Sequence, residues 1–364
     1  MHYQAERTYG CRVSEAWAFR GLKVLVLENE KLRVSVLTDK GADIFEFVHK
    51  SSDTNFMWRT PWGVRDPRRY LPSTGWPVGL WHDMYEGGWQ TVAPTGGYPI
   101  NYKGGDIGQH NESALMPWDV TVLEDHPERV SAKFHVRTAR TPYFIEKTLT
   151  LDSGSSVLTV EEAVTNEAEE PTECVWGQHI ALGEPFLNPN CRLDLPGARV
   201  YNLGDGSTVG RRLADTESGV WPSTPGGDGD PVDLRTFPAR SDRVQDLAVF
   251  HDLAGGWFSV TDVIRGVGLG FSFPQEIFRY IWYWQVFGGS SGYPMYRRTY
   301  NVGLEPFSSL PSGVPWPGSE ERTSLLLAPG ERRVAVIRAV AYENNTGVEQ
   351  ISRDGNVTPR VEPR

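Results

Sequence analysis

The sequence has few cysteines and no apolar run long enough to cross a membrane. Its 364 residues include three cysteines, Cys11, Cys174 and Cys191, which have neither CxxC spacing nor even parity. This pattern argues against a zinc knuckle and a disulfide framework, and it is typical of the reducing cytoplasm. The N-terminal residues also lack the apolar segment of a secretory signal. We therefore expect a cytoplasmic protein with no membrane partner.

Clusters of positive charge are missing as well. The 46 acidic residues outnumber the 36 basic ones, which gives a formal net charge of −10. No run of lysine or arginine resembles the basic surfaces that follow nucleic acid phosphates. We expect no nucleic acid partner.

Amphipathic helices of three turns or more are not evident, and 38 glycines and 26 prolines break the chain into short segments. Period-two alternation instead predicts strands. The clearest strands cover residues 23–28, 32–38, 43–49, 129–137, 143–151, 157–165, 323–328 and 334–342. The last two should form a hairpin across Pro329 and Gly330. Many short strands with close turns predict an all-β chain folded as a large antiparallel β-sandwich.

We expect a single domain over residues 1–364, with a polar and loosely held tail from about residue 343. Two long segments interrupt the strand pattern. Residues 59–83 are rich in tryptophan, proline and arginine, which favours a wall of a binding site. Residues 201–245 are rich in glycine, aspartate and proline, which favours a solvated excursion.

Aromatic residues are abundant, with 13 tryptophans, 14 tyrosines and 15 phenylalanines. Their flat faces either line a ligand groove or fill a β-rich core. Trp282 and Trp284 point to one side of their strand, and Ile281, Tyr283 and Gln285 to the other. One set should face the core and the other a site.

Three titratable residues stand out in similar local settings. His110 lies in a glycine-rich turn, His179 lies at the end of an apolar strand, and Glu305 lies between an apolar residue and a proline. Each alone is as readily a satisfied polar group at a sheet edge. A sandwich, however, can bring such separated positions together on one concave face.

The segments around these residues resemble the aldose 1-epimerase, or galactose mutarotase-like, superfamily. The matching motifs are GQHNE and PW within 108–118, WGQHIALGEPF at 176–186 and VGLEP at 302–306, in the same order along residues 23–342. The resemblance implies a wide antiparallel supersandwich that acts on a monosaccharide or short saccharide. It assigns Glu305 as the base, His179 as the acid and His110 as the group that holds the ring oxygen or a neighbouring hydroxyl. No cofactor or metal is implied.

The chain also departs from the pattern of this superfamily. Family members carry an Asn-Arg pair before the first histidine, where this chain has GGWQTVAPTGG and hence Trp89 and Gln90. The family's substrate-binding aspartate has its match in Asp246. The predicted substrate-binding residues are His82, Trp89, Gln90, Asp246, Gln285 and Arg298.

Two other functions remain open at this point. One is a metal-assisted or otherwise divergent enzyme acting on a modified or acidic sugar, using ligands of the types present at His82, His110, Glu112, His179 and Glu305. Arg65, Arg68, Arg69, Arg297 and Arg298 could then bind an acidic group. No HxH or HExxH spacing supports a metal site. The other function is a carbohydrate-binding protein without catalysis. An exposed strand edge would permit a homodimer.

Overall fold

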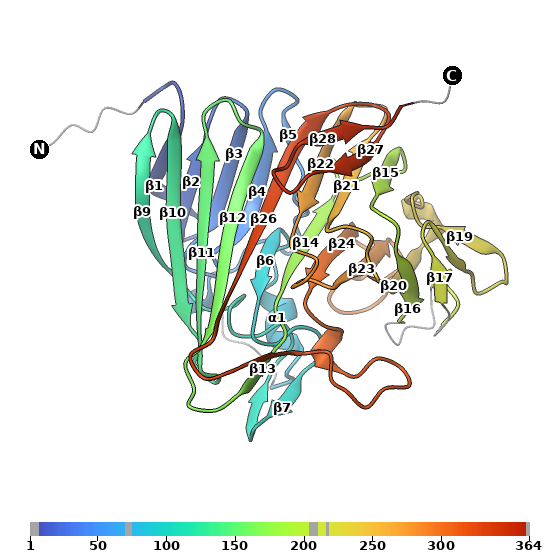
Figure 1. Ribbon diagram of the computed structural model, residues 1–364. Coiled ribbons are helices and arrows are strands. Elements are labelled where there is room, and N and C mark those ends of the chain that lie inside the picture. Colours follow the sequence, from blue (N-terminus) through green and yellow to red (C-terminus); the bar gives the residue numbers. More distant parts are fainter. Residues whose placement is uncertain (1–6, 70–74, 204–209, 216–217, 362–364) are drawn as a thin grey trace, which may run out of the picture.

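The computed structural model describes residues 7–69, 75–203, 210–215 and 218–361. Two large antiparallel sheets pack face to face (Figure 1), which confirms the predicted all-β sandwich. Helical structure in these residues is limited to α1 (Gly79–Met84) and the single turns η1 (Pro67–Arg69), η2 (Arg240–Asp242) and η3 (Pro311–Gly313). In the described part of the chain, no helix has the length and apolar character needed to span a membrane.

The larger sheet carries the candidate site. Its strand order is β1 (Arg12–Phe19), β2 (Leu22–Glu28), β3 (Leu32–Leu37), β4 (Asp43–His49), β6 (Trp89–Val92), β14 (Gly177–Gly183), β24 (Tyr300–Phe307), β23 (Tyr280–Phe287), β20 (Val244–His251), β16 (Arg199–Asn202), β17 (Ser218–Val220), β18 (Ser223–Pro225) and β19 (Pro231–Asp233), and β5 (Thr54–Asn55) pairs with β4. Its middle strands β14 and β24 are buried along their whole length, because both of their faces are covered.

The smaller sheet covers one face of the larger one. Its strand order is β15 (Cys191–Asp194), β21 (Trp257–Asp262), β22 (Val267–Ser272), β26 (Arg332–Glu343), β12 (Val157–Asn166), β11 (Tyr143–Asp152), β10 (Arg129–Arg137) and β9 (Asp119–His126). The alternation that predicted these strands is visible in β11, where every second side chain is buried against the larger sheet.

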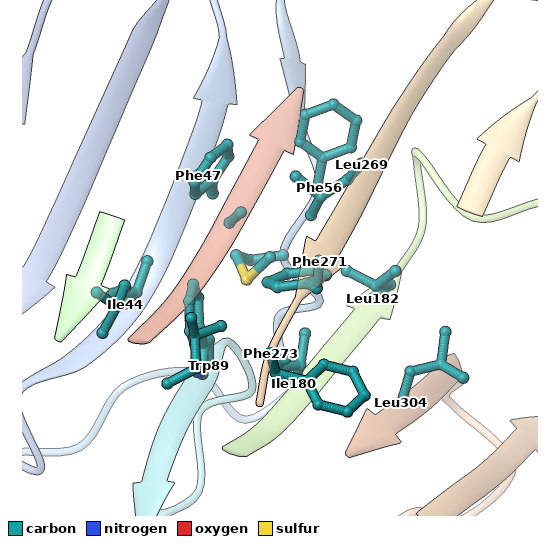
Figure 2. Close-up of a cluster of buried hydrophobic side chains, with 14 of the residues drawn as sticks. Ile44, Phe47, Phe56, Trp89, Ile180, Leu182, Leu269, Phe271, Phe273 and Leu304 are labelled. Carbon is teal, nitrogen blue, oxygen red and sulfur yellow. The ribbon is translucent and has the colours of Figure 1, made fainter. Parts of the chain in front are cut away.

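The main core lies between the two sheets (Figure 2). Ile180 and Leu182 of β14 and Leu304 of β24 face Phe271 of β22 there. Because side chains alternate across a strand, the odd-numbered neighbours of Ile180, Leu182 and Leu304 point to the opposite face of the larger sheet. His179 and Glu305 therefore lie on the face turned away from the core.

The predicted C-terminal hairpin is wrong in its pairing. β25 (Leu325–Leu327) pairs with β13 (Thr172–Cys174) in a separate two-stranded sheet, whereas β26 joins the smaller sheet between β12 and β22. The turn at Pro329 and Gly330 connects strands of different sheets, a distinction that local turn chemistry does not encode.

The segment after Tyr342 is also better ordered than predicted. β27 (Val348–Ile351) and β28 (Val357–Pro359) form a hairpin, and Val348 and Ile351 are buried against Trp257. A few apolar side chains in a polar stretch are enough to hold it on the sandwich.

The two interrupting segments contain regular structure in part. Within 201–245, strands β17, β18 and β19 extend the larger sheet, so the expected solvated excursion is partly a sheet edge. Residues 204–209 and 216–217 of this segment, and 70–74 of the other, lie outside the described residues. The remaining short pair, β7 (Ile100–Tyr102) and β8 (Gly105–Ile107), leads into the turn that carries His110.

Candidate functional site

His179 and Glu305 face each other across two paired strands. The register of β14 on β24 pairs Gly177 with Phe307 and Ala181 with Gly303, which sets His179 opposite Glu305. The Nε2 atom of His179 lies 3.5 Å from Oε1 of Glu305, and both side chains are almost fully buried. Residues 126 positions apart in the sequence are thus placed by sheet register alone.

His110 approaches the same pair from a loop. Its backbone has a positive φ of 44°, and its ring centroid lies 5.2 Å from that of His179. The backbone N–H of Gly97 donates a hydrogen bond of 3.1 Å to Nδ1 of His110. In a neutral imidazole the other nitrogen then carries the proton. His110 is therefore held as an Nε2–H donor.

The three residues line one cavity of about 410 Å³. Aromatic rings supply much of its wall, namely Trp76, Trp81, Tyr98, Trp282, Trp284 and Tyr293. Further polar groups come from His82, Gln109, Gln245 and Ser290. A largely apolar cleft with a few convergent polar groups is the usual form of a small-molecule site.

Burial sets the protonation of the trio. It lowers the pKa of His179 to about 3, and it raises the pKa of Glu305 well above the ordinary value. Burial and the neighbouring His179 and His82 lower the pKa of His110 well below its usual value. Both histidines are thus neutral near pH 7, and the Glu305 carboxyl holds a proton more tightly than an exposed one.

Tyr85 is a site residue that sequence reasoning missed. Its hydroxyl lies 3.3 Å from Nδ1 of His179, on the opposite side of the ring from Glu305. Burial, with Glu305 and Glu86 nearby, raises the pKa of Tyr85, so the hydroxyl keeps its proton. A single tyrosine in an aromatic loop carries no sequence signal for this contact.

Gly303 makes room for the Glu305 carboxyl. The two residues lie on the same face of β24, and a Cβ atom at position 303 would come within 2.2 Å of Oε1 of Glu305. The short residue therefore lets the carboxyl lie flat over the strand beside His179.

A buried polar network supports Trp81, whose ring centroid lies 4.5 Å from that of His110. The indole N–H of Trp81 donates to Gln90, which donates to Asp43. Lys40 pairs with Asp43 at 2.6 Å and with Glu86 at 2.7 Å, without exposure to solvent. Gln90 thus lies behind the cavity wall.

The other predicted substrate-binding residues do not all lie at the cavity. His82 lines the cavity. Trp89 points into the inter-sheet core, where its ring lies 5.2 Å from that of Phe271. Arg298 is exposed and donates to the backbone of Pro294 and Met295.

Asp246 and Gln285 lie opposite each other on β20 and β23, on the face turned away from the cavity. Both contact Arg212. Asp246 accepts a hydrogen bond from the backbone N–H of Arg212, and Gln285 accepts one of 2.6 Å from its guanidinium group. They anchor the segment after β16 rather than a ligand in the cavity. Trp282 and Trp284, on the other face of β23, line the cavity.

The arginines considered for an acidic substrate also lie elsewhere. Arg65 donates to the backbone of Asp83, Arg68 pairs with Asp66, and Arg69, Arg297 and Arg298 are exposed. Among the described residues that line the cavity, none is a lysine or arginine.

The residues considered for a metal do not form one cluster. Glu112 accepts from the backbone N–H groups of Ala139 and Arg140 and from the Thr141 hydroxyl, so it fixes that turn. Within the described ranges, no three His, Cys, Asp or Glu side chains gather in a group that could hold a metal ion.

Comparison with known proteins gives the family and the fold. The family model described as Domain of unknown function (DUF4432) matches residues 19–339, so the chain belongs to this family. No curated protein matches the sequence at a significant level.

Among solved structures, a candidate aldose 1-epimerase from Klebsiella pneumoniae subsp. pneumoniae superposes with a TM-score of 0.71 at 14% identity, over 92% of this chain and 84% of that chain. A candidate mutarotase from Salmonella typhimurium gives 0.62 at 11% identity, over 92% and 94%. A galactose mutarotase-like protein from Clostridium acetobutylicum gives 0.60 at 11% identity, over 92% and 99%. The chain thus has the galactose mutarotase-like fold, and the resemblance found in the sequence is confirmed at the level of fold.

Proposed function

We propose that this member of the DUF4432 family is an aldose 1-epimerase-like isomerase, which interconverts the anomers of a neutral sugar by opening and closing its ring. The observation that carries the proposal is the meeting of His110, His179 and Glu305 on one cavity. The reaction needs a base at the anomeric hydroxyl and an acid at the ring oxygen, both within hydrogen-bond reach. The trio supplies these groups on one face of the sheet.

The His179–Glu305 pair holds one proton near neutral pH. Before a sugar binds, this proton resides on Glu305, because burial disfavours both charged forms. Transfer to His179 across the 3.5 Å separation gives a carboxylate and an imidazolium. This tautomer is the reactive form, since it contains a base and an acid side by side.

Ring opening then conserves every proton. The Glu305 carboxylate takes the proton of the anomeric hydroxyl, the C1–O5 bond breaks, and the His179 imidazolium protonates the ring oxygen. The products are an open-chain aldehyde, a protonated Glu305 and a neutral His179. Rotation about C1–C2 and the reverse proton transfers close the ring on the other face of the carbonyl. The Nε2–H of His110 donates to the ring oxygen or a neighbouring hydroxyl.

The cavity favours a neutral sugar. Its aromatic walls suit the apolar faces of a sugar ring, and the carboxyl group of Glu305 repels an anion when ionised. No lysine or arginine among its described lining residues would compensate for a carboxylate or phosphate on the substrate. A uronate or sugar phosphate should therefore react more slowly than the corresponding aldose.

Nuclear magnetic resonance exchange between anomeric protons tests the reaction on neutral aldoses and the matching uronates. We expect wild-type protein to accelerate exchange of at least one neutral aldose, and Glu305→Gln to lower the rate about 10²- to 10⁴-fold. Glu184→Gln, which alters an exposed carboxylate just after the same strand as His179, is the matched control. Exchange no faster than in buffer on every sugar would leave a carbohydrate-binding protein as the better description.

A further inference from the structure

A second cavity lies on the same face of the larger sheet as the candidate site. Its volume is about 470 Å³, and His251, Tyr280 and Trp316 are among the residues that line it. His251 is the last residue of β20 and Tyr280 the first of β23, the same two strands that contribute Leu247 and Trp282 to the first cavity.

Strand alternation places both cavities on one side of the sheet. Leu247 and His251 are four residues apart on β20, so they share a face and are separated by roughly 13 Å along the strand. Val249 lies between them and packs in a buried cluster with Trp282 and Leu310. This cluster divides the two cavities, which share no lining residue.

Aromatic rings shape the second cavity. Trp316 and Tyr280 are nearly parallel, with an interplanar angle of 15° and centroids 6.3 Å apart. The Trp316 ring also lies 4.4 Å from His251 and 5.3 Å from Tyr201. These contacts hold the indole in place while it remains only partly buried. A fixed and accessible aromatic face suits the C–H-rich face of a pyranose.

Oriented polar groups accompany these rings. The Asp252 carboxylate lies 3.3 Å from Nδ1 of His251, and Arg279 donates to the backbone carbonyls of Ser308 and Thr323. Both side chains line the cavity, and Gln275 adds an amide. Together they offer donors and acceptors of the kind that hydroxyl groups require.

The charges of these groups favour a neutral ligand. Asp252 contributes one negative charge and Arg279 one positive charge to the lining. An anionic ligand would meet Asp252, and a cationic ligand would meet Arg279. A polyhydroxylated neutral ring can use both groups as hydrogen-bonding partners without a net charge to compensate.

We propose that this second cavity is a binding site for a neutral pyranose unit, separate from the site of the isomerase reaction. A saccharide held there leaves the first cavity free. This inference goes beyond the proposed function, because it assigns carbohydrate binding without proton transfer to a second site.

Methyl glycosides test this site, since their blocked C1 prevents anomer exchange. Binding of methyl β-D-glucopyranoside, methyl β-D-galactopyranoside and methyl α-D-mannopyranoside is measured by saturation-transfer difference spectroscopy and titration. The first cavity is weakened by combining His110→Ala with Glu305→Gln. Trp316→Ala and Asp252→Asn are then added separately to this background. Trp17→Ala is the control, because Trp17 is an exposed tryptophan on the distant edge strand β1.

We expect at least one glycoside to bind the doubly substituted protein, with about tenfold weaker affinity after Trp316→Ala and unchanged affinity after Trp17→Ala. If Trp316→Ala perturbs folding by circular dichroism, Asp252→Asn decides, with an expected loss of about three- to tenfold. Absence of binding, or binding that survives both substitutions, overturns the proposal. Anomer exchange by the wild type is measured separately, so failure of the isomerase reaction with persistent glycoside binding rejects only the proposed activity.

Discussion

The hydroxyl of Tyr85 and Nδ1 of His179 lie 3.3 Å apart, while the other nitrogen of the same ring faces Glu305 at 3.5 Å. The imidazole is thus held between a phenol that keeps its proton and the carboxyl group that would exchange a proton in the proposed reaction. Tyr85 belongs to the loop after α1, so a residue outside the motifs orients the proposed acid.

Tyr85→Phe should slow anomer exchange about three- to tenfold, because one hydrogen bond that orients His179 is lost. Sugar affinity should change less than kcat, since the phenol is buried behind the ring. Exchange rates and Kd values from titration measure the two effects. Tyr143→Phe serves as the control, because it alters another buried tyrosine, whose hydroxyl donates to the backbone of Glu173 and which does not line the cavity. An unchanged kcat in Tyr85→Phe would contradict the orienting role.

Gly303→Ala should reduce exchange about 10²-fold while leaving the fold intact. The new methyl group would overlap Oε1 of Glu305 and force the carboxyl out of line with the substrate. Gly105→Ala, on β8, adds a methyl group at 3.5 Å from its nearest neighbour and is the matched control. Wild-type exchange in Gly303→Ala would show that the carboxyl position is not critical.

The pH dependence of kcat/KM should show its acid limb well below pH 6.5, the ordinary value for histidine. Burial lowers the pKa of His179 to about 3, so the His179–Glu305 pair does not take up a second proton until the solution is strongly acidic. Exchange rates across a buffer series measure the limb, with circular dichroism at each pH to confirm folding. A midpoint near 6.5 would indicate a histidine in contact with water.

Lys40→Met should destabilise the fold by about 3–5 kcal/mol, because Asp43 and Glu86 would be left in the interior without their cation. The loss should be smaller at acidic pH, because burial raises the pKa of Glu86 and its carboxylate can then be protonated. Urea unfolding at two pH values measures the effect. Lys23→Met changes an exposed lysine of β2 and should be nearly neutral. Equal stability of the Lys40 and Lys23 variants would disprove the role of the buried cation.

His82 should make stability fall on acidification. Burial lowers the pKa of His82 to about 4, whereas the unfolded value is about 6.5. Between these values the unfolded chain binds more protons, so the free energy of unfolding decreases as pH falls from about 6.5 towards 4, by up to about 3 kcal/mol. Urea unfolding of His82→Gln should show a weaker decline than the wild type. His126→Gln, at an exposed position of β9, should follow the wild type.

The sequence was sufficient to predict the fold class because alternation and close turns report directly on half-buried strands. It identified His110, His179 and Glu305 as candidates through short motifs. The sequence could not show which of Trp282 and Gln285 faces the candidate site. Alternation places them on opposite faces of the strand but does not indicate which face packs against the core. The structure resolves this point: Trp282 lines the cavity, and Gln285 contacts Arg212 on the other side.

Long-range relationships account for the remaining differences. In the sequence, Asp246 matches the substrate-binding aspartate of the superfamily. In the fold, its carboxylate instead accepts a hydrogen bond from the backbone N–H of Arg212. Tyr85 has no motif, yet sheet register and the short helix α1 bring it to His179. Such contacts depend on how separate strands are ordered in the sheet, which local patterns do not contain.

The proposed acid and base stand on interior strands with hydrogen-bonded neighbours on both sides, whereas Trp76, His82 and Met295 reach the same cavity from connecting segments. In the proposed reaction the proton-transfer pair thus lies on the sheet, whereas connecting segments supply part of the wall that contacts the substrate. Grafting new connecting segments onto an unchanged sheet should redirect substrate preference without rebuilding the proton-transfer pair. Related proteins with this sheet can therefore differ in substrate preference through their loops and still keep the same proton-transfer pair.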